Sequence, residues 1–155
     1  MLFAASLLSM LAVPPTLTEG LPTKEVLTLR AAKAVADAAE AEAVRRGSAV
    51  VIAVVDDGGS LLVLHRLDDT QVASVEVGIG KARTAAIFRR PSREFEEQIR
   101  NGRVAALALP GATPLQGGIP LTAAGRVVGA IGVSGNTPQE DEDIAKAGAA
   151  AFGAP

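Results

Sequence analysis

The 155-residue chain contains no cysteine, tryptophan or tyrosine, and it has only one histidine and four phenylalanines. The lack of cysteine excludes disulfide scaffolds, thiolate-bound metals and cysteine nucleophiles. With a single histidine as well, the composition argues against a zinc or copper centre built from protein side chains alone. With aromatic residues at only 3%, a flat apolar ligand would have to be held mainly by aliphatic side chains.

An excess of basic charge is also missing, since the formal net charge is -2. There is no basic stripe with interleaved aromatic residues, which argues against nucleic-acid binding. The GxSxG, P-loop and GxGxxG spacings are absent, because Gly78-Ile79-Gly80-Lys81 lacks the rest of either phosphate motif. Length and composition fit one globular domain.

The first residues form an apolar run, Leu2 to Val13, that is too short to span a bilayer but has the length of a signal-peptide core. No basic residue precedes it, and Met10-Leu11-Ala12 is a poor cleavage signal. Two interpretations stay open, a truncated signal peptide and an apolar arm that packs on a neighbouring subunit. We favour the first, with residues 1–20 as leader and 21–155 as one domain. The protein would then be periplasmic or secreted, and cytoplasmic if the run is not a signal.

Periodicity and turn chemistry predict an α+β domain with an antiparallel sheet, in the order α-ββ-αα-ββ-α. The expected elements are helices over 29–46, 72–90, 93–100 and 138–152 and strands over 50–55, 60–66, 119–123 and 126–134. Thr28 and Thr137 are good N-caps for the first and last helices, and Ser92 is expected to cap the short third one. Residues 104–118 are expected to be a loop, because prolines and glycines interrupt them.

Lys81 is a candidate ligand-binding residue, because its helical neighbours Val77, Thr84 and Phe88 form a largely apolar face. A lysine in such a place needs an anion. That anion is either a carboxylate of a ligand or an acidic residue such as Asp68, and a third alternative is an ammonium that reaches water.

His65 is the strongest candidate for a haem-iron ligand or proton carrier, since it ends a predicted strand beside Arg66. A single histidine is more often structural, so both interpretations stay open. Gly117-Gly118 could offer backbone amides to an anion, although the simpler interpretation is a turn into the next strand. Asp56 and Asp57 are accounted for by turn chemistry.

Several joined motifs resemble one known family. They are LTLRAAKAVADAAEAEA, VVIAVVDDGGSLLVLHRLDD, ASVEVGIGKARTAAIF, GGIPL and GRVVGAIGVSGNTPQEDEDIAKAGAAAF. The chain from about Leu21 to Phe152 resembles the GlcG/HbpS-like haem-binding family, which is related to the C-terminal domain of PduO-type proteins. The resemblance implies a five-stranded antiparallel sheet flanked by helices, with the fifth strand from residues 107–115. It also implies a homo-oligomer such as a hexamer or octamer.

The first functional hypothesis is a non-enzymatic binder of haem or a similar anionic tetrapyrrole. Lys81 or Arg66 would bind a propionate, and His65 would be the candidate iron ligand, with Thr84, Gly117 and Gly118 also at the site.

The second hypothesis is a small enzyme acting on a short carboxylic acid or aldehyde. Lys81 would be cation or base, Asp68 or His65 the proton carrier, and the amides of Gly117-Gly118 would hold an oxyanion.

Small residues also crowd the second predicted helix, including Gly78 and Gly80. Glycine inside a helix costs roughly 1 kcal/mol relative to alanine, so a compensating close contact is expected. We predict that the Gly78 to Ala86 face lies in a homo-oligomer interface.

Overall fold

The computed structural model describes Thr18 and residues 20–153, and the apolar run from Leu2 to Val13 lies outside them. Within this described part, no helix has the length and apolar character needed to cross a membrane. Helix α1, Leu29–Arg46, begins where the Thr28 hydroxyl accepts a hydrogen bond from the Ala31 amide and ends at a left-handed Gly47. The N-cap and stop signals predicted these bounds correctly.

Four antiparallel strands form one sheet in the order β2-β1-β4-β3. Their bounds are β1 Val51–Asp56, β2 Leu61–Arg66, β3 Gly118–Ala123 and β4 Arg126–Ser134. Strands β1 and β4 pair at the centre, from Val51 opposite Ser134 to Asp56 opposite Gly129. The two hairpin turns therefore lie at the same end of the sheet, and β2 and β3 are its edges. The α+β class and the antiparallel hairpins are confirmed.

The turn between β1 and β2 is held by its own first residue. The Asp56 carboxylate accepts hydrogen bonds from the amides of Gly58 and Ser60, at 2.9 and 2.8 Å. Gly59 has φ +84°, a left-handed conformation that glycine adopts without steric cost. This turn chemistry was predicted, and it explains Asp56 without a catalytic role.

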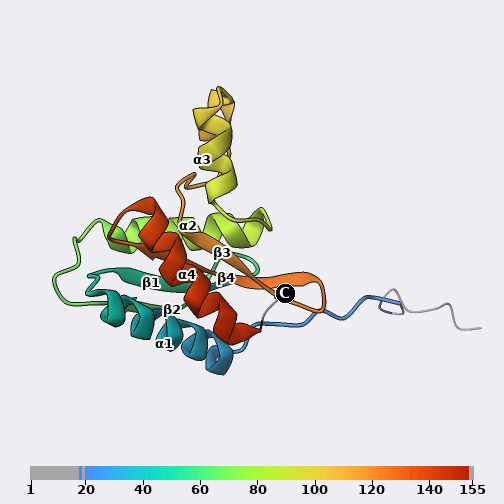
Figure 1. Ribbon diagram of the computed structural model, residues 1–155. Coiled ribbons are helices and arrows are strands. Elements are labelled where there is room, and N and C mark those ends of the chain that lie inside the picture. Colours follow the sequence, from blue (N-terminus) through green and yellow to red (C-terminus); the bar gives the residue numbers. More distant parts are fainter. Residues whose placement is uncertain (1–17, 19, 154–155) are drawn as a thin grey trace, which may run out of the picture.

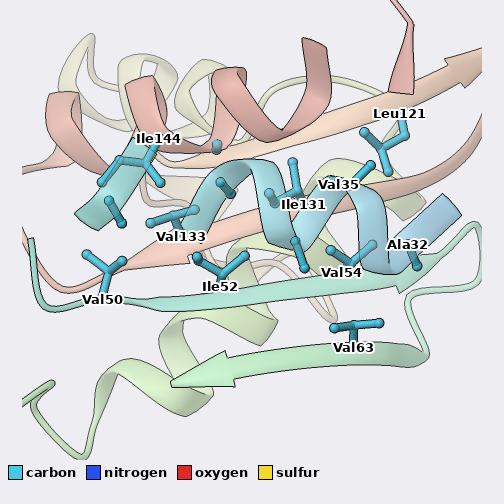
Figure 2. Close-up of a cluster of buried hydrophobic side chains, with 14 of the residues drawn as sticks. Ala32, Val35, Val50, Ile52, Val54, Val63, Leu121, Ile131, Val133 and Ile144 are labelled. Carbon is cyan, nitrogen blue, oxygen red and sulfur yellow. The ribbon is translucent and has the colours of Figure 1, made fainter. Parts of the chain in front are cut away.

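Helices cover both faces of the sheet (Figure 1). Helix α1 and helix α4, Pro138–Phe152, pack on one face, and helix α2, Ser74–Ile87, packs on the other. Figure 2 shows the larger core, in which Val50, Ile52 and Val54 meet residues of α1, α4 and β4. The intervening Ala53 and Val55 point to α2, because successive side chains of a strand alternate between faces.

Helix α2 is shorter than predicted, ending at Ile87 instead of continuing to Arg90. Arg89 adopts a left-handed conformation, φ +56°, and Arg90 precedes a proline, which disfavours helical backbone. Helix α4 begins with the predicted capping box, in which Thr137 and Glu140 bind each other's backbone amides.

The small residues of α2 pack closely against other parts of the same chain. A Cβ atom on Gly78 would lie 3.2 Å from Val51, and one on Gly80 would lie 2.2 Å from the Thr113 hydroxyl. Ala82 and Ala85 are fully buried in the α2 side of the core. The contact that compensates for these glycines is therefore intramolecular, and the Gly78 to Ala86 face gives no reason to place an interface there.

The expectation of about five strands is wrong, because residues 107–115 form no strand. Residues Val104–Ala108 form a short 3-10 helix, η1, and a turn with extended chain follows. Pro110 and Pro114 have no amide hydrogen to give to a strand partner. The amide of Thr113 bonds to the Thr84 hydroxyl at 2.7 Å, and its carbonyl accepts from the same group at 3.3 Å. A side chain of α2 thus provides hydrogen bonds to part of the backbone of this segment.

Helix α3, Arg93–Arg100, and η1 pack against each other and stand away from the sheet (Figure 1). We call residues 93–115 the arm. At its base Phe95 is buried and its ring centroid lies 4.9 Å from that of Phe88. Farther out, Val104 and Leu107 are each 61% exposed. The arm is therefore anchored at its base and presents aliphatic side chains to solvent.

Candidate functional site

The candidate residues predicted from sequence fall into two groups on opposite faces of the sheet. His65 is paired with Ile52, whose side chain belongs to the core beneath α1 and α4. Lys81 belongs to α2, on the other face, and reaches toward β4. In one copy of the chain the sheet separates them, so they do not form a single site.

Lys81 is buried, with 5% of its side chain exposed, and its ammonium forms an ion pair and a further hydrogen bond. It donates to the Asp141 carboxylate at 2.7 Å and to the Val133 carbonyl at 3.0 Å. The other oxygen of Asp141 accepts from the Asn136 amide at 3.0 Å. Burial raises the pKa of the Asp141 carboxyl, and the Lys81 ammonium opposes that rise. The anion that Lys81 needs is an acid of the chain, but it is Asp141 and not Asp68.

Gly117 and Gly118 belong to the same buried cluster. A Cβ on Gly117 would lie 3.0 Å from the Lys81 Nζ, and one on Gly118 would lie 2.2 Å from the Lys81 carbonyl oxygen. These glycines let the start of β3 approach α2 closely. The Gly118 amide already donates to the Ser92 hydroxyl at 2.8 Å, so it is not free to hold an oxyanion.

Ser92 does not cap α3 with its side chain, contrary to the prediction. Its backbone is helical, and its hydroxyl instead donates to the Leu115 carbonyl at 2.6 Å while accepting from Gly118. Thr84 is likewise fully buried and binds Gly80 and Thr113. Both hydroxyls therefore fasten the end of the arm to α2 and β3.

His65 has a different environment on the edge strand β2. Its Nδ1 lies 2.5 Å from a carboxylate oxygen of Glu40 in α1. An ionised carboxylate only accepts hydrogen bonds, so Nδ1 is the donor and carries the proton. The side chain is 26% exposed, and in the described part of the chain Nε2 has no hydrogen-bond partner. This leaves Nε2 without a partner among the described residues, on a ring whose orientation the bond to Glu40 fixes.

Arg66, the last residue of β2, and Asp68, beyond the strand, are both exposed. Arg66 is on the opposite face from His65, and one of its terminal nitrogens donates to the Thr70 carbonyl at 3.0 Å. Asp68 lies in the turn after the strand. It is not the acid that pairs with Lys81, which is Asp141. Val44, one helical turn beyond Glu40, is 65% exposed and adds apolar surface to this edge.

Sequence reasoning missed Glu40, Asp141 and the structural role of Ser92. Asp141 stands in the first turn of α4, where an acidic residue needs no further explanation, and Glu40 has no distinguishing pattern in α1. Among the residues that the structure describes, no group of three histidine or acidic side chains could hold a metal ion. An iron bound here would need ligands that the chain does not supply, as a porphyrin does.

Comparisons with known proteins agree with one another. The model of the family described as "Haem degrading protein HbpS-like" matches residues 27–150. Protein GlcG of Escherichia coli strain K12 is 43% identical over 112 residues, 72% of this chain and 84% of GlcG. The crystal structure of a Streptomyces reticuli HbpS double mutant has a TM-score of 0.81 and 36% identity, covering 93% of this chain and 99% of that one. A crystal structure of a PduOC:heme complex has a TM-score of 0.75 and 26% identity, covering 82% and 95%.

Proposed function

Because this chain belongs to the HbpS-like family, we propose that it binds haem or a closely similar anionic tetrapyrrole, with His65 as the iron ligand. The observation that carries the proposal is the hydrogen bond from His65 Nδ1 to Glu40. Histidines that bind metals usually donate their other ring nitrogen to a carboxylate or carbonyl, which fixes the tautomer and the ring orientation. A relative of this fold solved with heme adds support.

The surroundings of His65 suit one face of a porphyrin. The His65 side chain is partly exposed, and Val44 supplies exposed aliphatic surface on α1, one helical turn beyond Glu40. Arg66 is the cation we assign to a propionate: its side chain leaves the opposite face from His65, but it is exposed on an edge strand, so it would reach the ligand around that edge. Lys81 is not assigned to the ligand, since it is buried and already paired with Asp141.

Titration with haemin, followed at the Soret band, tests this function. We expect saturable binding by the wild type, and for His65→Ala a changed band and at least about tenfold weaker affinity. Glu40→Gln should keep the histidine ligand but weaken binding about tenfold or more, because the partner of Nδ1 is altered. Glu76→Gln, on the opposite side of the sheet, is the matched control.

Two results would overturn parts of the proposal separately. Absorbance that rises without saturation in the wild type would remove haem binding as the function. A wild-type band and affinity in a folded His65→Ala variant would remove only the iron-ligand assignment.

We also propose that the protein is a homo-oligomer that associates through the arm. Each copy carries two complementary features, the exposed aliphatic tip of the arm and an apolar groove of about 410 Å³ beside β3 and α4. The groove is lined by residues such as Ile119, Pro120 and Phe152. A second copy therefore offers a groove to the arm of the first and an arm to its groove.

A further inference from the structure

A cleft at the opposite end of the sheet from His65 is not used by the proposed function. It has a volume of about 930 Å³ and lies where both hairpin turns meet the N-terminal segment and the end of α2. Strand β2 runs from the first turn to His65, so about four residues, or roughly 13 Å, separate the two places. A ligand in the cleft would not compete with one at His65.

The side chains that line the cleft carry one more positive than negative charge. Three cations, Lys24, Arg89 and Arg126, face two acids, Glu25 and Asp57. Lys24 and Asp57 neutralise each other through an ion pair at 2.8 Å. In the part of the chain that the structure describes, the guanidinium groups of Arg89 and Arg126 have neither an ion pair nor a hydrogen bond.

Arg89 holds a position where glycine would be easier to accommodate. It follows the last residues of α2 with φ +56°, the left-handed conformation in which helices commonly end on glycine. A side chain there brings a conformational cost, so an arginine at this position is better explained by what its guanidinium binds than by the fold.

The rest of the lining favours an organic molecule over a bare ion. Val127 and Val128 provide an apolar wall, and Ala124-Gly125 brings a tight turn with positive φ at both residues to the rim. The volume is within the range of small-molecule sites. Two guanidinium groups on different elements can each bind a carboxylate through two parallel hydrogen bonds.

We propose that this cleft binds a small organic acid with two carboxylates, held by Arg89 and Arg126. Lys24 is already paired with Asp57, so Arg89 and Arg126 are the cations left to bind the ligand. The proposal does not depend on haem binding, because it uses none of the residues around His65.

Calorimetric titration of the full chain with succinate and with glutarate tests the proposal, and inorganic phosphate and sodium chloride at equal ionic strength serve as comparison solutes. We expect saturable binding of one of the diacids, weakened at least about tenfold in Arg89→Gln and in Arg126→Gln, since each removes charged hydrogen bonds. Arg30→Gln, which removes the same charge from the first turn of α1, should bind like the wild type.

A second variant separates binding from folding. Arg89→Gly keeps the left-handed backbone without its cost, so its melting temperature should equal or exceed that of the wild type while its affinity falls. Diacid affinity unchanged in Arg89→Gly and in Arg126→Gln would overturn the proposal. So would the absence of saturable binding by either diacid, or an equal response to phosphate.

Discussion

Lys81 in α2 and Asp141 at the start of α4 form a buried ion pair at 2.7 Å, joining helices from opposite sides of the sheet across 60 residues of chain. The ammonium also caps the end of β4 by donating to the Val133 carbonyl. Both side chains are at least nine-tenths buried. The pair therefore fixes where α4 begins relative to α2, and it is a structural element of the fold.

Replacing one partner of this pair should lower the free energy of unfolding far more than replacing both. Lys81→Met leaves the Asp141 carboxylate buried without its cation, and we expect a loss of about 3–5 kcal/mol in the free energy of unfolding. The double variant Lys81→Met/Asp141→Asn should recover a substantial part, because asparagine keeps an oxygen for the Asn136 amide. Urea unfolding of both single variants and the double variant gives the coupling energy. Lys33→Met, on the exposed surface of α1, should change little.

Additive effects in that cycle, within about 0.5 kcal/mol, would contradict the pairing. Binding of haemin should be unchanged in the folded double variant, since the ligand assignment does not include Lys81.

Local signals in the sequence predicted most of the elements. Thr28 and Thr137 mark their helices because an N-cap is read from a few neighbouring residues, and Asp56 with Gly59 marks its turn for the same reason. The strand expected over residues 107–115 came from the family resemblance, whereas the prolines and glycines of residues 104–118 predicted the loop that the structure shows apart from the short helix η1. The hydroxyl of Thr84, 29 residues away, takes the place of a strand partner for Thr113.

The candidate site was predictable only in part. His65 stood out as the only histidine, but any of 17 acidic residues could have been its partner. Its pairing with Glu40 depends on how α1 crosses β2, which a single sequence does not specify. The same holds for Lys81, whose apolar helical face was recognised but whose acid came from α4. Pairing between distant residues is set by packing and not by spacing.

The contact between α2 and β4 gives a second prediction. A Cβ on Gly132 would lie 2.3 Å from the Gly78 carbonyl oxygen and 2.4 Å from the Ala82 amide nitrogen, so Gly132→Ala must move backbone. We expect a loss of about 1–3 kcal/mol or more. A Cβ on Gly78 would be tight only against the Val51 side chain, at 3.2 Å, and would meet the Gly132 carbonyl oxygen at an ordinary 3.8 Å. The gain of roughly 1 kcal/mol in helix propensity should offset that contact in Gly78→Ala. Chemical denaturation of the two variants measures the difference.

Equal stability of Gly132→Ala and the wild type would show that α2 lies farther from the sheet than described. A large loss in Gly78→Ala would show that the helix has no room to adjust at Val51.

The arm gives the last prediction, which concerns assembly. Val104 and Leu107 are both 61% exposed on an element that leaves the sheet, and burying them against a second copy would remove aliphatic surface from water. Val104→Asp/Leu107→Asp should therefore shift the protein to smaller species by light scattering at micromolar concentration, with its circular dichroism unchanged. Val72→Asp is the matched control, because Val72 is 74% exposed just before α2 and away from the arm.

The groove provides an independent check on the same interface. If the arm of one copy occupies the groove beside β3, Ile119→Asp should dissociate the oligomer as the arm variant does, since a charge would enter an apolar contact. A monomeric wild type would refute the assembly itself. An oligomer that survives both the arm and the groove variants would refute this interface. The small residues of α2 pack against the same chain, so the next surface to test would be the exposed apolar one near Val44 and β2.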